Sequence, residues 1–158
     1  MMSTAQTCGA AVRPPRMLIV LLATGIAIDW ALGTLGLLPG VAIARSLAGL
    51  LTVAAGICLL VVCMRRFSGA GTNVPTILPT TALVTHGPYG WSRNPIYLAL
   101  LAIYAGLALL AASPSALLLG MLGALVIHFG VVLREEQYLR HLFGQVYDDY
   151  CQRTRRWL

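Results

Sequence analysis

A run of uncharged residues in the second half of the chain constrains the fold more than any other feature. Residues 95–133 contain no Asp, Glu, Lys or Arg. As one α-helix this run would be about 58 Å long, which is close to twice the hydrocarbon thickness of a bilayer. The Ser-Pro-Ser sequence at 113–115 breaks the run near its middle. It therefore predicts a hairpin of two membrane spans, at 95–112 and 115–133.

The composition of the whole chain also indicates a membrane protein. Hydrophobic residues make up 58% of the 158 residues and charged residues 10%, and the mean hydropathy is +0.80. Soluble domains carry roughly 25% charged residues, so this chain has too few charges for a water-soluble surface, and it is too hydrophobic for a disordered chain. Residues 17–38 and 47–64 are long enough to cross a bilayer and predict two further spans.

These spans define the predicted architecture. We expect an all-α integral membrane protein with four transmembrane helices, a cytoplasmic loop at 65–94 and an amphipathic cytoplasmic helix in the tail, 134–158. Residues 1–158 form a single membrane domain in this prediction. The first apolar run exceeds the roughly 7–15 residues of a signal-peptide core and contains Asp29, so we expect it to remain as a span.

The distribution of arginine predicts the orientation in the membrane. All eleven basic residues are arginine. With the N-terminus inside, ten of them are cytoplasmic and Arg45 alone is outside, which satisfies the positive-inside rule. We therefore expect both termini in the cytoplasm, at an inner or plasma membrane if the protein is bacterial. These arginines flank apolar runs and do not line one helix face, so the net charge of +6 does not indicate a nucleic-acid partner.

Asp29 is the one acidic residue inside a predicted span. A charge at that depth costs about 2.5–3.5 kcal/mol on insertion scales. Two placements satisfy this cost. In the first, Asp29 faces the bundle, either protonated or paired with Arg45 or His128. In the second, the first helix ends near Trp30 and Asp29 lies at the outer interface.

The cysteines and histidines do not indicate a metal centre. The four cysteines contain no CxxC pair, and the three histidines show neither HxxxH nor HExxH spacing. We therefore expect no metal and no disulfide framework. Cys58 and Cys63 are interpreted as small core residues of a span.

The long polar connection ends in a helix-start signal. Gly, Pro, Thr and Asn dominate residues 68–94, which predicts an ordered loop with short turns. Asn94 is a favourable N-cap and Pro95 suits the first helical position, so the third span should begin there. The N–H groups of that helix start, beside Arg93, suit a carboxylate or a phosphate. The same residues also suit a purely structural cap, and both interpretations stay open.

The tail has apolar residues at helical spacing, which predicts an amphipathic helix that Gly144 can interrupt. Such a helix can lie on the membrane surface, with the terminal arginines against anionic lipid. Glu135 and Glu136 do not fit that interpretation, because acids gain nothing from the dipole where a helix ends. They suit the binding of a cation or a diol. The apolar repeat consists of Leu139, Leu142, Phe143, Val146, Tyr147 and Tyr150.

Three blocks of residues flank the predicted hairpin. They are Leu83-Val84-Thr85-x-Gly87-Pro88-Tyr89, Arg93-Asn94-Pro95-x-Tyr97 and Glu135-Glu136-x-x-Leu139-x-x-x-Phe143-Gly144-x-x-Tyr147-x-x-Tyr150. In this order they resemble the isoprenylcysteine carboxyl methyltransferase and phospholipid methyltransferase superfamily. The resemblance runs from about Gly71 to the C-terminus, over half the chain, and the first two spans match only in hydropathy.

The resemblance implies that S-adenosylmethionine is the methyl donor, bound on the cytoplasmic side between the loop, the start of the third span and the tail. The donor's carboxylate would suit the helix start at Asn94, and Glu135 would suit its ammonium group or ribose hydroxyls. The residues implied to contact this cofactor are Ala82, Leu83, Val84, Tyr89, Asn94, Pro95, Ile96, Tyr97 and Glu135.

Three positions depart from the superfamily pattern. Asn94 replaces a usual His and can form hydrogen bonds but cannot act as a base. Ala99 replaces a usual Gly two places after Tyr97, which narrows the approach of the backbone. Val131 stands where members that methylate prenylcysteine carry an Arg for the substrate carboxylate, which argues against a prenylcysteine substrate.

Methyl transfer from a sulfonium is an in-line displacement that needs no metal, so catalysis is mainly alignment and dehydration. A carboxylate acceptor needs no base and would be oriented by Arg93, Arg134 or Arg153. A thiol or amine acceptor must lose a proton, which Glu136 or His86 would accept. The candidate catalytic residues are therefore Glu136, Arg134 and Arg93. We expect the acceptor to enter from the lipid between spans, which predicts an apolar or membrane-partitioned molecule.

Several functions stay open from the sequence. The main hypothesis is methyl transfer to a lipophilic acceptor at the cytoplasmic face, as in isoprenylcysteine carboxyl O-methyltransferases. N-methylation of a lipid amine and S-methylation of a small thiol compete with O-methylation. A rival class is a non-catalytic four-helix scaffold or redox-complex subunit, which would show no saturable cofactor binding. A reductase related to sterol reductases is a further alternative, but the chain has no nicotinamide fingerprint. The expected partners are the acceptor and membrane lipids.

Overall fold

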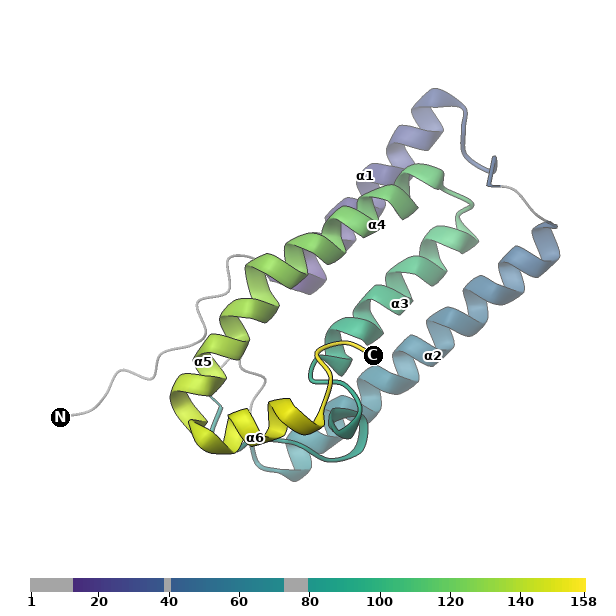
Figure 1. The fold of residues 1–158 in the computed structure, drawn as a ribbon. Helices are drawn as coiled ribbons and strands as arrows, with labels where there is room; N and C mark the ends of the chain where they lie inside the picture. Colours follow the sequence, from purple (N-terminus) through teal and green to yellow (C-terminus); the bar gives the residue numbers. More distant parts are fainter. Residues whose placement is uncertain (1–12, 39–40, 73–79) are drawn as a thin grey trace.

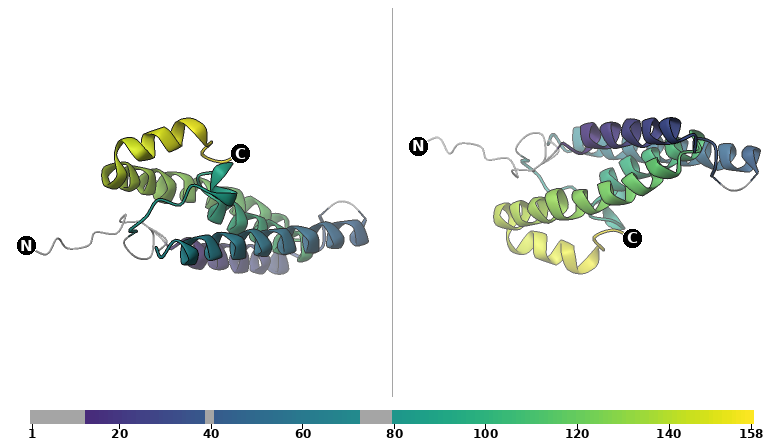
Figure 2. Two further views of the ribbon diagram at one scale, coloured as in Figure 1. Left: turned by 90° about the horizontal axis from the view of Figure 1, so that it is seen from below. Right: turned by 90° about the horizontal axis from the view of Figure 1, so that it is seen from above.

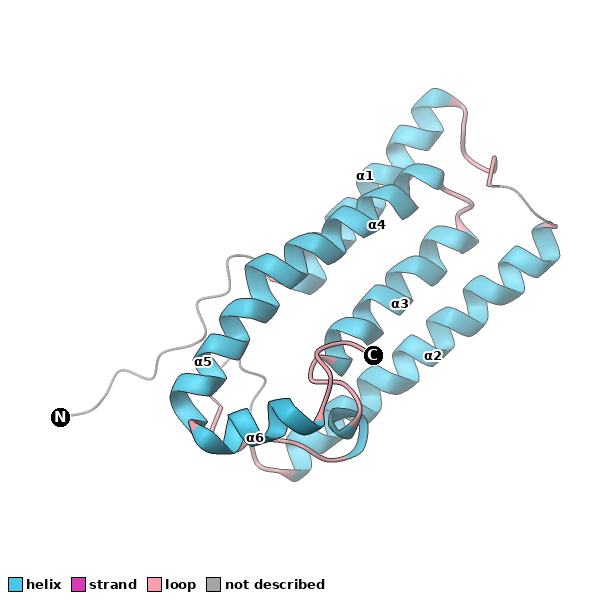
Figure 3. Cartoon of the chain, in the orientation of Figure 1, coloured by secondary structure: helices cyan, strands magenta, loops and turns pink. Residues whose placement is uncertain are grey.

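The structure is a computed structural model that describes residues 13–38, 41–72 and 80–158. Within these ranges the regular elements are all helices and no strand occurs (Figure 1, Figure 3). In chain order they are α1 (Pro14–Leu32), α2 (Ala42–Gly69), the 3-10 helix η1 (Gly87–Gly90), α3 (Pro95–Leu110), α4 (Pro114–Ile127), the π-helix η2 (His128–Val132), α5 (Leu133–Phe143) and α6 (Gln145–Arg153).

Three of the described helices are long and apolar enough to cross a membrane. They are α1, α2 and the continuous helix Pro114–Phe143, which consists of α4, η2 and α5. Helix α3 is also apolar, but its 16 residues span about 24 Å at 1.5 Å per residue. The predicted all-α fold is therefore confirmed for the described residues, and three of their helices have spanning length and composition; the fourth crossing stays a prediction.

Two helix ends in the first half differ from the predicted span ends. Helix α1 ends at Leu32, earlier than predicted, because Gly33 adopts the left-handed conformation (φ 67°) and closes the last turn. Helix α2 continues to Gly69, so Arg65 and Arg66 lie inside the helix. Arginine is a good helix former and does not end a helix. The loop predicted from residue 65 therefore begins after Gly69.

The second half shows the predicted turn between two apolar helices. Helix α4 begins at Pro114, directly after Ser113, whose hydroxyl caps the helix by accepting the Ala116 N–H (3.1 Å). Helix α4 continues through η2 into α5, which begins at Leu133, so the tail predicted from residue 134 starts within a continuous helix. The predicted amphipathic tail helix is two helices, α5 and α6, interrupted at Gly144 (φ 53°) as the sequence indicated.

The helices pack as two pairs. Helix α2 lies against α3, where a Cβ added to Gly49 would lie 2.9 Å from the carbonyl oxygen of Gly106. Helix α1 lies against α4, where a Cβ added to Gly25 would lie 2.5 Å from the Cα of Ala116. Small residues let membrane helices approach closely and so stabilise their association. Contacts between α3 and α4 join the two pairs.

The hairpin of α3 and α4 determines where polar residues gather. Because α4 runs back along α3, the start of α3 and helix α5 lie at the same end of the bundle (Figure 1). Helix α6 folds back across this end, and the C-terminus lies beside the start of α3 (Figure 1, Figure 2). The main-chain N–H of Arg93 donates to the carbonyl of Arg155 there (2.9 Å).

Asp29 anchors the opposite end of the bundle. Its side chain is 1% exposed and accepts hydrogen bonds from the hydroxyls of Ser113, Ser115 (2.7 Å) and Thr34 (2.8 Å) and from the Ser115 N–H (3.0 Å). Asp29 therefore faces the bundle, as in the first placement, and α1 ends at Leu32, near Trp30, as in the second. The partners predicted for Asp29, Arg45 and His128, are wrong. Arg45 instead donates to a main-chain carbonyl (3.1 Å). The carboxylate lies at the start of α4, where the helix dipole stabilises it.

We predict that Asp29→Leu lowers the free energy of unfolding by about 1–3 kcal/mol, because the buried Ser113 hydroxyl and the Ser115 N–H lose their acceptor. Asp29→Asn keeps one acceptor oxygen and should retain part of that stability. Thermal unfolding of the detergent-solubilised protein measures both. Equal midpoints for the two variants and the unaltered protein would contradict this role.

Candidate functional site

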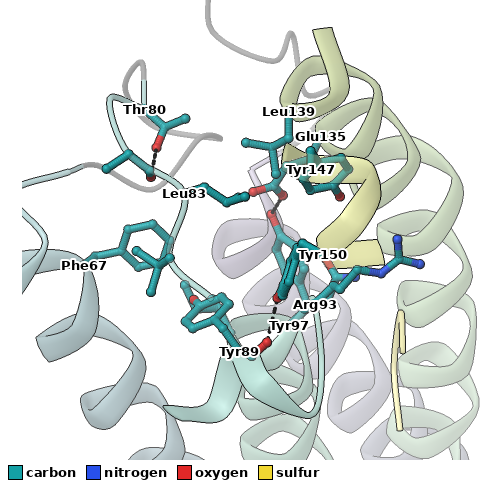
Figure 4. Close-up of a pocket in the computed structure, with 14 residues that line it drawn as sticks. Phe67, Thr80, Leu83, Tyr89, Arg93, Tyr97, Glu135, Leu139, Tyr147 and Tyr150 are labelled. Carbon is teal, nitrogen blue, oxygen red and sulfur yellow. Dashed lines mark hydrogen bonds between the residues drawn. The ribbon is translucent and has the colours of Figure 1, made fainter. Parts of the chain in front are cut away.

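A pocket opens between the start of α3 and helices α5 and α6 (Figure 4). Apolar and aromatic side chains form most of its wall. It is lined by Phe67, Thr80, Ala82, Leu83, Val84, Tyr89, Arg93, Asn94, Ile96, Tyr97, Glu135, Leu139, Tyr147 and Tyr150.

The structure brings together the residues that the three sequence blocks pointed to. Eight of the nine residues predicted to contact a cofactor line this one pocket: Ala82, Leu83, Val84, Tyr89, Asn94, Ile96, Tyr97 and Glu135. The ninth, Pro95, is buried at the first position of α3 and does not line the pocket. Their convergence is a fact of the fold, and their role in binding stays a prediction.

A hydrogen bond between Tyr97 and Glu135 crosses the pocket wall. The Tyr97 hydroxyl, in the first turn of α3, donates to Oε2 of Glu135 in α5 (2.7 Å) (Figure 4). Tyr97 is buried and Glu135 is half-buried. The bond therefore fixes a carboxylate at the surface of a largely apolar pocket, where it suits a cationic or hydroxyl-bearing ligand.

The segment after residue 79 is held against the end of α2 by one threonine. The Thr72 hydroxyl accepts the N–H groups of Thr81 (2.8 Å) and Ala82 (3.1 Å) and shares a hydrogen bond with the Thr80 hydroxyl (2.9 Å). These bonds satisfy main-chain donors that have no helix or strand to pair with. They also place the following residues, Ala82 to Val84, along the pocket.

Three tyrosines enclose the pocket from η1 and α6. The Tyr150 hydroxyl donates to the main-chain oxygen of Tyr89 (2.7 Å), and the Tyr89 ring packs edge-on against Phe67 (5.4 Å between centroids). Burial raises the pKa of Tyr89, Tyr147 and Tyr150 above its ordinary value. Each phenol therefore stays protonated at neutral pH and cannot act as a base.

Asn94 occupies the predicted N-cap position of α3, but its side chain does not cap the helix. Its Nδ2 donates instead to the main-chain oxygen of Arg156 (2.9 Å), and its main-chain N–H donates to the Ser92 hydroxyl (3.2 Å). The predicted helix start is therefore correct and the predicted side-chain cap is wrong. The C-terminal segment competes successfully for the Asn94 amide because it lies directly beside it.

Of the three candidate catalytic residues, Arg93 alone lines the pocket. Its stem forms part of the wall and its guanidinium points away (Figure 4), toward the Cys151 thiol and Glu136 (3.4 Å). Glu136 is buried outside the pocket lining and accepts two hydrogen bonds from Arg156. Arg134 is exposed on α5 and does not line the pocket.

The other groups considered for acceptor chemistry also lie outside the pocket. His86 is exposed, with Nδ1 3.3 Å from the Thr85 hydroxyl, and Arg153 is exposed and donates to the carbonyl of Asp149 (3.2 Å). Val131 is 0% exposed in the apolar core, so the position of the superfamily's substrate-binding Arg is inaccessible here. Ala99 is likewise buried, and its carbonyl faces Gly56 of α2.

Five lining residues were not predicted as ligand contacts: Phe67, Thr80, Leu139, Tyr147 and Tyr150. The last three carried a signal, because they belong to the apolar repeat of the tail, and the buried face of that repeat turned out to face the pocket. Phe67 was missed because α2 was expected to end before it. Thr80 carried no recognisable signal. Among the described residues, no group of three or more His, Cys, Asp or Glu side chains could hold a metal ion.

Comparison with known families gives one match. The model of the family described as phospholipid methyltransferase matches residues 44–146, which are 103 of the 158 residues. The matched range contains every pocket-lining residue except Tyr147 and Tyr150. None of the curated proteins compared with the chain matches it. The superfamily predicted from the three sequence blocks is therefore confirmed.

We predict that Thr72→Val accelerates amide hydrogen exchange at Thr81 and Ala82, because both N–H groups lose their acceptor. Thr72→Ser keeps the hydroxyl and should leave the exchange of these amides close to that of the unaltered protein. Exchange measured by mass spectrometry over residues 80–94 checks both. If the Val and Ser variants exchange alike, Thr72 does not hold this segment.

Proposed function

Because the chain belongs to the phospholipid methyltransferase family, we propose that it transfers a methyl group from S-adenosylmethionine to a lipophilic acceptor at the cytoplasmic face of a membrane. The observation that supports this most is the convergence of all three sequence blocks on one pocket. The family is one of methyltransferases of membrane lipids, and the helices of spanning length fit that setting.

We propose four membrane crossings, with α3 as the third. Helix α3 is short, but it is apolar, packs along α2 and is followed directly by α4, which supports a crossing of the same layer. With an even number of crossings both termini lie on one side, and the arginine distribution favours the cytoplasm for that side. This orientation places the pocket in the cytoplasmic leaflet, within a single membrane domain.

The pocket's own residues fit the proposed donor. Glu135 would hold its ammonium group or ribose hydroxyls, with Tyr97 fixing the carboxylate. The aromatic rings of Tyr89 and Phe67 and the neighbouring apolar side chains would exclude water. When bound, the donor supplies an electrophilic methyl group on a sulfonium. The bond from the methyl group to sulfur breaks as its bond to the acceptor forms, so the pocket acts mainly by alignment and dehydration. An amine acceptor attacks as the neutral base and must also lose one proton.

Two observations favour a lipid amine over a carboxylate as acceptor. The first is Val131, which leaves a buried apolar residue where a carboxylate-binding Arg would stand. The second is Arg93, whose guanidinium points out of the pocket toward Glu136. Glu135 is the acidic group that lines the pocket, and a carboxylate favours a neighbouring amine over a second carboxylate. O-methylation of an isoprenylcysteine-like carboxylate and S-methylation of a thiol remain the alternatives.

We predict saturable binding of S-adenosylmethionine to the detergent-purified protein. Glu135→Ala should weaken it by about tenfold or more, because a charge-assisted hydrogen bond contributes roughly 1.5–3 kcal/mol. Tyr97→Phe should weaken it less, since the Glu135 side chain remains in the pocket wall. Asp149→Ala removes an exposed acid outside the pocket and is the matched control. Unsaturable binding would instead indicate a non-catalytic scaffold, and equal affinities in all variants would contradict the site.

Transfer of a radiolabelled methyl group then tests the acceptor. Vesicles that contain phosphatidylethanolamine offer a lipid amine, and vesicles of phosphatidic acid with a fatty acid offer a carboxylate without an amine. We expect label in the first and none in the second. Label confined to the second would contradict the preference for an amine.

A further inference from the structure

The last residues of the chain close over the start of α3. We call residues 154–157 the C-terminal clasp. The main-chain oxygen of Arg155 accepts the Arg93 N–H (2.9 Å), and that of Arg156 accepts from Asn94 Nδ2 (2.9 Å) and from the Ser92 hydroxyl (3.5 Å). The clasp thus holds three consecutive residues, of which Arg93 and Asn94 line the pocket.

A buried carboxylate ties the clasp to α5. Glu136 is 5% exposed and accepts hydrogen bonds from Nε (2.8 Å) and Nη2 (2.9 Å) of Arg156. Nη2 of Arg93 lies 3.4 Å from Oε1 of Glu136. The paired Glu136 in turn raises the pKa of Arg156. Glu136 is buried and the Arg93 side chain is mostly buried, whereas the Arg156 side chain is 38% exposed. Removing a partner of a buried carboxylate is unfavourable, so these contacts hold the clasp, α5 and the start of α3 in one arrangement.

The clasp also contacts the π-helix η2, which directly precedes α5. The indole N–H of Trp157 donates to Nδ1 of His128 (3.2 Å), and the two rings lie 5.9 Å apart. His128 is the first residue of the π-helix η2, directly before α5. The position of α5 determines where Glu135 meets the pocket, so the clasp acts on both walls of the site.

Helix α6 lies between this clasp and a glycine hinge. At its start, Gly144 has φ 53° and an added Cβ would meet no atom within 4 Å. At its end, the chain passes directly into the clasp. Between these two ends, Tyr147 and Tyr150 reach into the pocket wall (Figure 4). Tyr150 also binds α6 to the Tyr89 carbonyl (2.7 Å), and the clasp adds the contacts that follow the C-terminal end of the helix.

We propose that Arg156 and Glu136 are positioning residues that hold α6 closed over the methyl-donor pocket, with Glu136 as the buried anchor of the clasp rather than a proton acceptor. The proposal rests on the proposed function for the identity of the ligand. It explains why Glu136 is buried outside the pocket with both oxygens bonded to Arg156, a geometry that does not suit a general base.

The test uses Cys151, which lies on α6 with its thiol against Arg93. In a background where Cys8 and Cys58 are replaced with Ala, the rate of maleimide labelling reports the opening of α6. Arg156→Gln should raise that rate and weaken donor binding, each by about tenfold. Arg155→Gln removes the same charge from an adjacent exposed side chain, keeps the main-chain contacts and should change neither. Arg156→Lys should fall between, because lysine lacks the two-pronged guanidinium.

A double-mutant cycle distinguishes an anchor from a base. If Glu136 anchors the clasp, Glu136→Gln and Arg156→Gln affect labelling and donor affinity non-additively, because both break one interaction. If Glu136→Gln instead lowers kcat with unchanged labelling and donor affinity, the proposal is overturned. It is overturned equally if Arg156→Gln labels like Arg155→Gln. If neither the unaltered protein nor its variants bind the donor, the proposed function fails. The labelling rates still show whether Arg156 and Glu136 hold α6 closed.

Discussion

The antiparallel return of the chain between α3 and α4 is the constraint on which the site depends. An uncharged run too long for one crossing has to fold back, and the capped start of α4 fixes where it does so. Asn94 and Glu135, 41 positions apart in the sequence, therefore line one pocket. The hydrogen bond from Tyr97 to Glu135 then joins the two arms of the hairpin at the pocket wall.

The polar residues have different roles at the two ends of the bundle. At one end, Asp29 satisfies the hydroxyls and the N–H around the start of α4 and so holds α1 against α4. At the other end, the two adjacent acids of α5 have separate environments. Glu135 lies in the pocket wall, whereas Glu136 is buried behind it with Arg156. One residue along the helix thus separates a carboxylate in the pocket wall from a carboxylate bonded to Arg156.

Much of this arrangement was predictable from the sequence, because hydropathy and helix-breaking residues determine where apolar helices begin and turn back. Eight of the nine residues that the resemblance pointed to line one pocket, and their role in binding stays a prediction. The partners of individual polar side chains were not predictable. The amide of Asn94 bonds to a carbonyl of the C-terminal segment, and Asp29 bonds to hydroxyls of α4. Such pairings depend on contacts between distant segments, and sequence spacing does not encode them. Phe67 was missed because the second span was predicted to end at residue 64, before Arg65 and Arg66, whereas α2 continues through both arginines to Gly69.

A structure determined with S-adenosylhomocysteine bound would show directly whether this pocket binds the methyl donor. We predict the ligand in the pocket between the start of α3 and helices α5 and α6, with its ammonium group or ribose within hydrogen-bonding distance of Glu135. A ligand seated elsewhere in the bundle, or in this pocket without any contact to Glu135, would contradict it.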